Sequence, residues 1–302
     1  MMKAKQLIRI IALLLAILTM LPLSVSCDEW ESRKKNEIAD SAPATEAPTE
    51  APTESETEPE TEPETEPETE PEPLKLKFAS YNIQHGAGAN LDMTKIAKNI
   101  TAQGIDIVGL QEVDQNVKRS NKIDTMKLLS EATGYKYYAF FKAINHEGGE
   151  YGVGILSKYP IIATEKIMLD SGTYEQRVLG RAEIDVEGVT VNFFVTHTSY
   201  ESASIRKKQF QQINAEVLKY DNFVLTGDFN TNNFSEYSVI ERSGMVNNSQ
   251  KSVVTFPSKS SSIDNIVYSS SAWSFGYAYT VTDSYSDHYM LYATGTYLKE
   301  RP

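Results

Sequence analysis

The sequence predicts an α/β fold in which two mixed β-sheets pack face to face with helices on the outside. Three observations predict it. Strand-like segments are dense from residue 74 onward, helical periodicity follows the first two of them, and another helical segment precedes a late apolar strand. About 229 residues remain after the N-terminal region, which is enough for one domain with a large core.

The strand segments either alternate between apolar and polar residues or are continuously apolar. They cover 74–83, 105–113, 137–141, 151–157, 178–186, 189–198, 222–230, 262–270, 277–283 and 288–298. Apolar residues at helical spacing cover 91–104, 125–134 and 203–220, with a shorter piece at 235–244. This order predicts a single globular domain over 74–302, which we expect to be a monomer.

Residues 1–27 have the features of a secretory signal. Basic residues precede an apolar run from Ile10 to Leu23, which is shorter than a typical membrane span. The only cysteine, Cys27, follows Val25-Ser26, in a context that resembles a bacterial lipoprotein box. We therefore expect a lipid anchor at Cys27 and a location at the bacterial cell surface. Ordinary cleavage with secretion, or retention as a single-span anchor, are the alternatives.

Residues 28–73 are expected to be a disordered linker rich in Thr, Glu and Pro. From Thr45 the chain repeats every four residues, and it has almost nothing apolar to bury. Such a tract is typical of an extended spacer, and a ligand for a partner protein is the alternative. The chain carries a net charge of −12, but residues 1–73 hold 17 acidic and 6 basic side chains, which leaves 24 acidic and 23 basic in 74–302. A domain this close to neutral lacks the basic charge expected of a strong non-specific nucleic-acid binder, but it is compatible with a secreted nuclease that works at low salt.

The segment FVLTGDFNTN, residues 223–232, places an acid and an amide at the end of an apolar strand. In a strand, Asp228 and Asn230 would share one face. A turn is the other interpretation, because Gly, Asp and Asn favour turns. Polar residues of the kinds used in metal and phosphate chemistry also stand at other predicted strand ends. They are Asn82, Glu112, His197, Asp264 and the pair Asp287-His288.

These residues lie in motifs that resemble the endonuclease/exonuclease/phosphatase superfamily. The motifs are Tyr81-Asn82-Ile83, Leu110-Gln111-Glu112-Val113, the segment YGVGILSK at 151–158, Thr196-His197, Gly227-Asp228-Phe229-Asn230, Ile263-Asp264 and Ser286-Asp287-His288. They occur in the order of that family and span the globular part. The resemblance implies a four-layered α/β sandwich and Mg²⁺-dependent cleavage of phosphate esters, with Mn²⁺ as a possible substitute.

The resemblance implies that Glu112 is the principal Mg²⁺ ligand, because a hard cation prefers carboxylate oxygen. Asn82 and Asp287 would complete or flank the metal site. Asp228 would accept the proton of an attacking water, and Asn230 would hold that water or a phosphate oxygen. His288, oriented by Asp264, is the competing proton acceptor, and the sequence leaves this choice open.

His197 is expected to donate to the phosphate from the other side. Related deoxyribonucleases pair this His with a Glu, for which Glu150 is the candidate, and place an Arg on the phosphate. Arg177 is the candidate for that Arg, and Arg181 competes with it. His85 lies close to the site in sequence, with either a substrate contact or a structural role.

Three functions remain open on the sequence alone. The first is a phosphoesterase for small molecules, lipid head groups or sugar phosphates. The second is an extracellular nuclease, for which Lys118-Arg119 with Lys122, or Arg206-Lys207-Lys208, would contact the phosphate backbone. The third is an inactive scaffold domain, which the full set of polar residues argues against.

Overall fold

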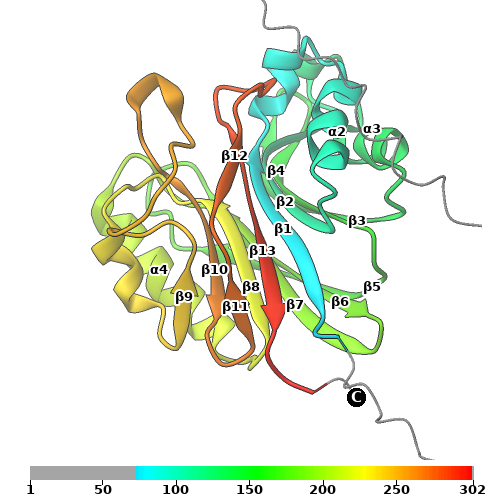
Figure 1. Cartoon of the computed structure of the whole chain (residues 1–302). Helices are drawn as coiled ribbons and strands as arrows, with labels where there is room; N and C mark the ends of the chain where they lie inside the picture. The colour runs from blue at the N-terminus through cyan, green and yellow to red at the C-terminus, as the bar shows by residue number, and fades with distance from the viewer. Residues whose placement is uncertain (1–71, 301–302) are drawn as a thin grey trace, which may run out of the picture. The chain divides into compact units, whose positions relative to one another are not determined.

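A computed structural model describes residues 72–300, which contain two β-sheets, three α-helices and several short 3₁₀ helices (Figure 1). The expected signal sequence, 1–27, and nearly all of the expected linker, 28–73, lie outside the described residues. No helix within 72–300 combines the length and the apolar character needed to cross a membrane.

The first sheet has seven strands in the order β11-β13-β1-β2-β4-β3, with β12 paired to β13. Their bounds are β1 Lys75–Asn82, β2 Ile107–Gln115, β3 Tyr137–His146, β4 Gly149–Ser157, β11 Trp273–Phe275, β12 Tyr279–Val281 and β13 Met290–Tyr297. The second sheet has six strands in the order β5-β6-β7-β8-β10-β9. Their bounds are β5 Ile161–Leu169, β6 Arg177–Val186, β7 Val189–His197, β8 Phe223–Asp228, β9 Ser243–Met245 and β10 Asp264–Ser269.

The helices form the two outer layers (Figure 1). Helices α2 (Met93–Ala102) and α3 (Thr125–Thr133) bury apolar side chains against the first sheet, and α4 (Ala203–Val217) does so against the second. Each begins at a residue whose side chain accepts a backbone hydrogen bond: Asp92, Asp124 and Ser202. A third apolar cluster fills the space between the sheets. This arrangement confirms the four-layered α/β sandwich of two mixed sheets.

Strand direction brings the polar strand ends to one edge of the sandwich. Strands β1 and β2 are parallel, as are β7 and β8, so the carboxyl ends of each pair lie at the same edge. Strand β10 runs antiparallel to β8 and begins there, with Asp264 opposite Asp228, and His197 of β7 also stands opposite Asp228. Residues distant in sequence therefore meet at neighbouring positions.

The two sheets approach closely behind this edge, at Gly109 of β2. A Cβ atom at Gly109 would stand 2.0 Å from Thr226 Oγ1 and 2.9 Å from Val195 Cγ2. Only a residue without a side chain allows β2 to pack this closely against β7 and β8.

Several predicted elements need correction. Strand β5 was not expected, because it lies at the edge of its sheet and its polar centre, Thr164–Lys166, is exposed and breaks the apolar pattern. The short strands β9 and β11 carry too few residues for a periodic signal. The helix expected at 235–244 is wrong, because this stretch forms the 3₁₀ helix η3 (Phe234–Val239) followed by β9. The other 3₁₀ helices are η1 (Gln84–Ala89), η2 (Lys118–Ser120) and η4 (Pro257–Lys259).

Candidate active site

A polar cavity of about 630 Å³ lies at the edge where the strand ends meet. Seven of the expected residues line it: Glu112, Arg177, His197, Asp228, Asn230, Asp287 and His288. Asp264 and Asn82 are fully buried behind its wall and contact the lining residues. The structure therefore brings together nine of the ten site residues expected from the sequence, and it separates Glu150 from them.

Glu112 reaches the cavity from a β-bulge. The pairing of β2 with β4 shifts between Leu110 and Val113, and Glu112 has a left-handed backbone with φ of 56°. Strand β2 continues to Gln115, so Glu112 does not end the strand as the sequence suggested. The extra residue at a bulge redirects a side chain out of the regular alternation. That local irregularity aims the carboxylate at the site.

The GDFN segment contains both a strand end, at Asp228, and a turn, at Asn230. Strand β8 ends at Asp228, and Asn230 follows in a left-handed conformation with φ of 51°. The Asn230 backbone N–H donates to Asp228 Oδ1 at 2.9 Å, and its side-chain amide donates to the Thr198 carbonyl at 2.9 Å. The two side chains therefore do not share a strand face. A turn holds them together, and it fixes the Asp228 carboxylate at the cavity wall.

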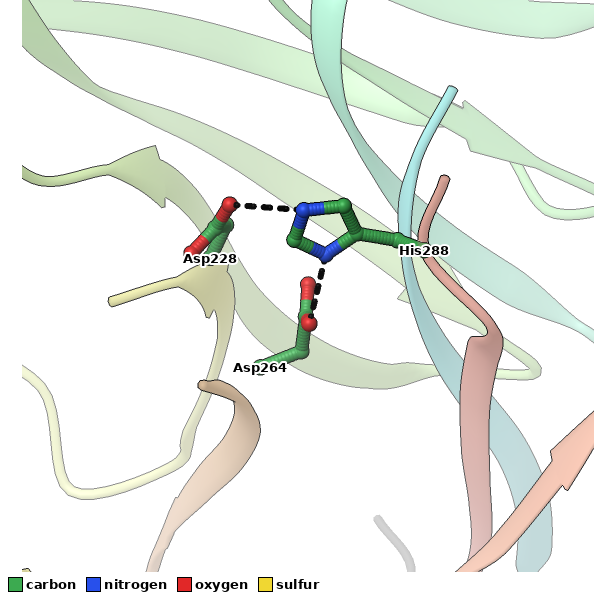
Figure 2. Close-up of side chains that lie close together, drawn as sticks. All are labelled: Asp228, Asp264 and His288. Atoms are coloured by element: carbon green, nitrogen blue, oxygen red, sulfur yellow. Dashed lines mark hydrogen bonds and ion pairs between the residues drawn. The ribbon is translucent and has the colours of Figure 1, made fainter. Parts of the chain in front are cut away.

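His288 lies between two carboxylates (Figure 2). Its Nδ1 is 2.9 Å from Asp264 Oδ2, and its Nε2 is 3.6 Å from Asp228 Oδ2. Burial alone would lower the pKa of His288, but Asp264, and then Asp228, raise it to about 10. The imidazole is therefore protonated at neutral pH, and the expected orienting role of Asp264 agrees with this geometry.

Asp228 sits among several donors. Its Oδ2 accepts from Asn82 Nδ2 at 3.1 Å and is 3.5 Å from His197 Nε2. Burial, followed by the negative charge of Asp264, raises the pKa of Asp228 to about 7, although His288 acts in the opposite direction. A carboxylate that exchanges its proton near neutral pH suits general base catalysis.

Arg177, at the start of β6, fixes the state of His197. Arg177 Nη1 lies 3.0 Å from His197 Nδ1 and 3.0 Å from Glu175 Oε1. Because a guanidinium can only donate, His197 Nδ1 must accept, and the ring proton then lies on Nε2, which faces Asp228. Burial, then the charge of Arg177, lowers the pKa of His197 well below its usual range. His197 is therefore a neutral hydrogen-bond donor toward the cavity.

The expected pairing of Glu150 with His197 is not what the structure shows. Glu150 lies on β4 and forms an ion pair with Lys142 at 2.9 Å, outside the cavity. The partner of His197 is Arg177 instead. Arg181 was the alternative to Arg177 as the arginine that contacts the phosphate. It lies in a different part of the sheet, where it donates to Asn192 Oδ1 at 2.8 Å and lies over the Tyr220 ring.

The side chains around Glu112 fit a divalent cation. Glu112 Oε1 accepts from Asn82 Nδ2 at 3.0 Å, and among the described residues no lysine or arginine forms an ion pair with it. Burial raises the pKa of Glu112, and the negative charge of Asp287 raises it further. His288 and Arg177 act in the opposite direction from a distance, but neither forms an ion pair with Glu112. A half-buried carboxylate influenced by a second carboxylate, with no ion-pair partner among the lysines and arginines of residues 72–300, offers the oxygen ligands that Mg²⁺ or a related ion prefers.

Asn82 contributes to this site as a flanking residue. Its amide nitrogen donates to Glu112 and Asp228, and its side-chain oxygen accepts the Gln84 backbone N–H at 3.0 Å. Ser286 Oγ also donates to the Asn82 carbonyl at 2.7 Å, which ties the segment carrying Asp287 to the end of β1. Asn82 thus holds the carboxylates in place.

Asp228, Asp264 and His288 also place ligand atoms within 4.8 Å of one another, close enough to hold a metal ion. The hydrogen bond between His288 and Asp264, and the raised pKa of His288, favour a proton relay at this position, because a protonated imidazole cannot bind a metal. The acid–base cluster and the Glu112 carboxylate are therefore two adjoining parts of one site.

Several residues that line the cavity were not expected from the sequence to do so, and Tyr151 is among them. Tyr151 is 8% exposed, lines the cavity and packs its ring 5.2 Å from the Arg119 guanidinium, which forms an ion pair with buried Asp114. Burial, then the charge of Glu112, raises the pKa of Tyr151 well above its usual range, so its hydroxyl stays protonated. Its position at the start of the YGVGILSK motif was the available signal.

This constellation is that of a metal-dependent phosphoric ester hydrolase: a carboxylate of shifted pKa, a protonated and a neutral imidazole, and an adjoining carboxylate site for a cation. The sequence model of the endonuclease/exonuclease/phosphatase family matches residues 79–288, and the chain belongs to this family. Members of the family are metal-dependent phosphoesterases and nucleases. The comparison with curated proteins returned no match.

Solved structures share the fold at low sequence identity. An endonuclease/exonuclease/phosphatase from Beutenbergia cavernae DSM 12333 is 20% identical with a TM-score of 0.64, covering 74% of this chain and 72% of that chain. A mannosyl-6-phosphatase from Bacteroides thetaiotaomicron VPI-5482 is 17% identical with a TM-score of 0.57, covering 72% and 98%. D. rerio TDP2 complexed with a single-strand DNA product is 17% identical with a TM-score of 0.59, covering 73% and 98%.

Proposed function

We propose that the protein is a secreted or surface-anchored, Mg²⁺-dependent phosphoesterase that acts on a small-molecule, lipid or sugar phosphate ester. The observation that carries this proposal is the cavity of about 630 Å³, which contains the acid–base cluster and the Glu112 carboxylate in one concave space. Cavities of this size are typical of small-molecule sites. One of the similar structures is a mannosyl-6-phosphatase, which supports a sugar phosphate as a candidate substrate.

Three of the six basic residues that a nuclease would use form ion pairs with acidic side chains. Arg119 pairs with Asp114, Arg206 with Glu236, and Lys208 with Asp170. These ion pairs reduce the positive charge that would release counterions from a nucleic-acid backbone. They favour a small substrate, and an extracellular nuclease is the second candidate, which the experiment below separates.

Asp228 is the general base in the proposed mechanism. A water positioned for in-line attack on phosphorus gives its proton to Asp228, whose pKa of about 7 allows it to be deprotonated and still accept a proton. As the new bond forms, the bond between phosphorus and the ester oxygen breaks, and the leaving alkoxide takes a proton from solvent. His288, held as a cation by Asp264, remains protonated and donates to a non-bridging phosphate oxygen.

His197 donates to the phosphate from its Nε2–H, in the tautomer that Arg177 imposes. Asn230 stands beside Asp228 at the cavity wall and helps to position the water. A divalent cation, Mg²⁺ or Mn²⁺, held by Glu112 and Asp287, would neutralise charge on the phosphate oxygens.

A panel of substrates tests this proposal in the purified protein. The panel contains supercoiled plasmid, single-stranded RNA, sphingomyelin, inositol phosphates, sugar phosphates and aryl phosphate mono- and diesters. The variants Asp228→Ala and His288→Ala remove the acid–base groups, and Glu131→Gln on the exposed face of α3 is the surface control. We expect turnover of small esters to exceed plasmid nicking, and both site variants to lose about a hundredfold or more.

The outcomes discriminate between the candidates. Salt-sensitive plasmid nicking that exceeds turnover of small esters would assign a nuclease. Full activity in EDTA would contradict the metal dependence, and inactivity of a folded, metal-binding wild type on the whole panel would support a scaffold role.

We also propose that the N-terminal region attaches the domain to the bacterial cell surface through a lipid on Cys27. Lipoprotein processing requires that cysteine, so Cys27→Ala should release the protein into the medium or leave it unprocessed. Unchanged membrane association and processing of the variant would rule out lipidation there.

A further inference from the structure

His85 faces Glu112 without bonding to it. Its Nδ1 lies 3.9 Å from Glu112 Oε2, which is too long for a hydrogen bond. That nitrogen is buried and has no hydrogen-bond partner among residues 72–300. Buried polar atoms in proteins are nearly always paired, so an unpaired nitrogen aimed at a carboxylate indicates a missing ligand between them.

The backbone around His85 is built to hold the ring in this place. Gln84 and His85 both have φ of 45°, and Gly86 has φ of 82°. The turn is fixed at its start by the bond from the Gln84 N–H to Asn82 Oδ1, and by a bond from the Gly86 N–H to the Ile83 carbonyl at 2.8 Å. Successive left-handed residues are strained, and such strain persists where the surroundings demand one conformation.

Two carboxylates act on the space beside the His85 ring. The positive charge of Arg119 also acts on His85, but Asp114 pairs with that guanidinium at 2.8 Å. Glu112 Oε2 lies 3.9 Å from His85 Nδ1, and the negative charge of Asp287 acts on both His85 and Glu112. A cation placed there would be attracted by both carboxylates and would give the imidazole nitrogen a partner.

The separation of the two atoms suits a shared metal ion. Ligand bonds to Mg²⁺ or Zn²⁺ are about 2.1 Å long, so two ligands of one ion stand at most about 4.2 Å apart. The separation of 3.9 Å between His85 Nδ1 and Glu112 Oε2 falls within that limit. A histidine whose role is only structural would be expected to donate to the carboxylate at hydrogen-bond distance.

We propose that His85 binds the divalent cation through Nδ1, beside the carboxylate of Glu112. This inference rests on the proposed function, which places the cation at Glu112. An imidazole ligand favours transition metals, whereas Mg²⁺ prefers a site made only of oxygen. His85 therefore shifts the preference of the site from Mg²⁺ toward Mn²⁺, and it determines which metal the enzyme takes up.

Mn²⁺ binding to the purified full-length protein, without substrate, tests the proposal. Pulsed electron paramagnetic resonance of the bound Mn²⁺ detects a nitrogen coupling when a histidine is a direct ligand, and the wild type is expected to show it. His85→Asn is the test variant, because Asn tolerates left-handed backbone and so preserves the turn. His146→Gln, on β3, is the matched control for loss of a histidine.

In His85→Asn we expect the nitrogen coupling to disappear and the affinity for Mn²⁺ to fall by roughly tenfold or more. The affinity for Mg²⁺, measured by competition, should change less, and His146→Gln should retain both the coupling and the affinities. Thermal unfolding in EDTA shows whether His85→Asn remains folded.

A wild type that binds Mn²⁺ without a nitrogen coupling would overturn the inference by itself. So would a coupling that persists in His85→Asn, since another histidine would then be the ligand. Failure of the wild type to bind Mn²⁺ or Mg²⁺ at all would instead contradict the proposed function, because Glu112 would then hold no cation.

Discussion

Replacing Asp264 by Asn should strongly lower the pKa of His288, so that its imidazolium loses the proton at a lower pH than in the wild type. The shift of the His288 pKa from 6.5 to about 10 corresponds to about 5 kcal/mol in favour of the cation. Asp264 supplies the largest favourable contribution, because its Oδ2 is 2.9 Å from Nδ1 and is buried. Without that charge, burial acts against the cation, and we expect the pKa to fall by at least about 2 units.

Imidazole ¹⁵N NMR of the metal-free protein measures this directly. In the wild type, His288 should remain an imidazolium up to about pH 10, whereas in Asp264→Asn it should titrate near or below about pH 8. A His288 pKa that stays above about 9 in the variant would refute the reasoning. With metal present, the variant should lose activity first at alkaline pH. There His288 loses its proton, and with it the positive charge that contacts the phosphate in the proposed mechanism.

The same shift makes the stability of the metal-free protein depend on pH. The folded pKa of His288 lies above its unfolded value of 6.5, so its stabilising contribution is complete below pH 6.5 and is lost as the pH rises toward about 10. The midpoint of thermal unfolding of the wild type in EDTA should therefore be lower at pH 9.5 than at pH 6.5. In Asp264→Asn the difference between the two midpoints should be smaller. An equal decline in both proteins would show that other groups cause it.

Three further substitutions test separate parts of the structure. Glu112→Gln should weaken Mg²⁺ binding by at least about tenfold in calorimetry, and unchanged binding would move the metal to another site. Arg177→Met removes the donor to Nδ1 of His197, so ¹⁵N NMR should show a mixture of tautomers where the wild type shows Nε2–H alone. Gly109→Ala should destabilise the protein by about 1–3 kcal/mol in urea unfolding, because the new Cβ would meet Thr226, and Thr226→Ala in the same chain should restore part of that loss.

Much of the fold follows from local patterns. Strands with buried apolar faces, such as 189–198 and 222–230, were predicted within two residues, because burial on both faces leaves a continuous apolar run. Strand β5 could not be predicted in this way, since an edge strand with an exposed polar centre lacks the periodicity on which prediction depends. Short strands such as β9 exist only because a neighbouring strand offers hydrogen bonds.

The site was predictable to the extent that strand order determines it. Residues at the ends of strands meet when the strands are neighbours, so Asp228, Asp264 and His197 could be expected together. Contacts that depend on side-chain direction could not be foreseen. Arg177 opens β6 beside the end of β7 and therefore reaches His197, whereas Glu150 on β4 pairs with Lys142 across the hairpin.

His197 is paired with Arg177 and not with the carboxylate expected from the sequence, and this pairing alters how charge is distributed in the cavity. A carboxylate partner would stabilise a protonated His197, but the guanidinium keeps that ring neutral, and Glu175 balances the guanidinium. His288 is then the cationic ring, and Asp264 balances it. The carboxylate of Glu112 remains without a cationic partner among the described residues, and a phosphate ester would bring further negative charge to the same space. A divalent cation held at Glu112 would offset both negative charges, so the pairing of the protein's own charges favours metal-dependent binding of the phosphate.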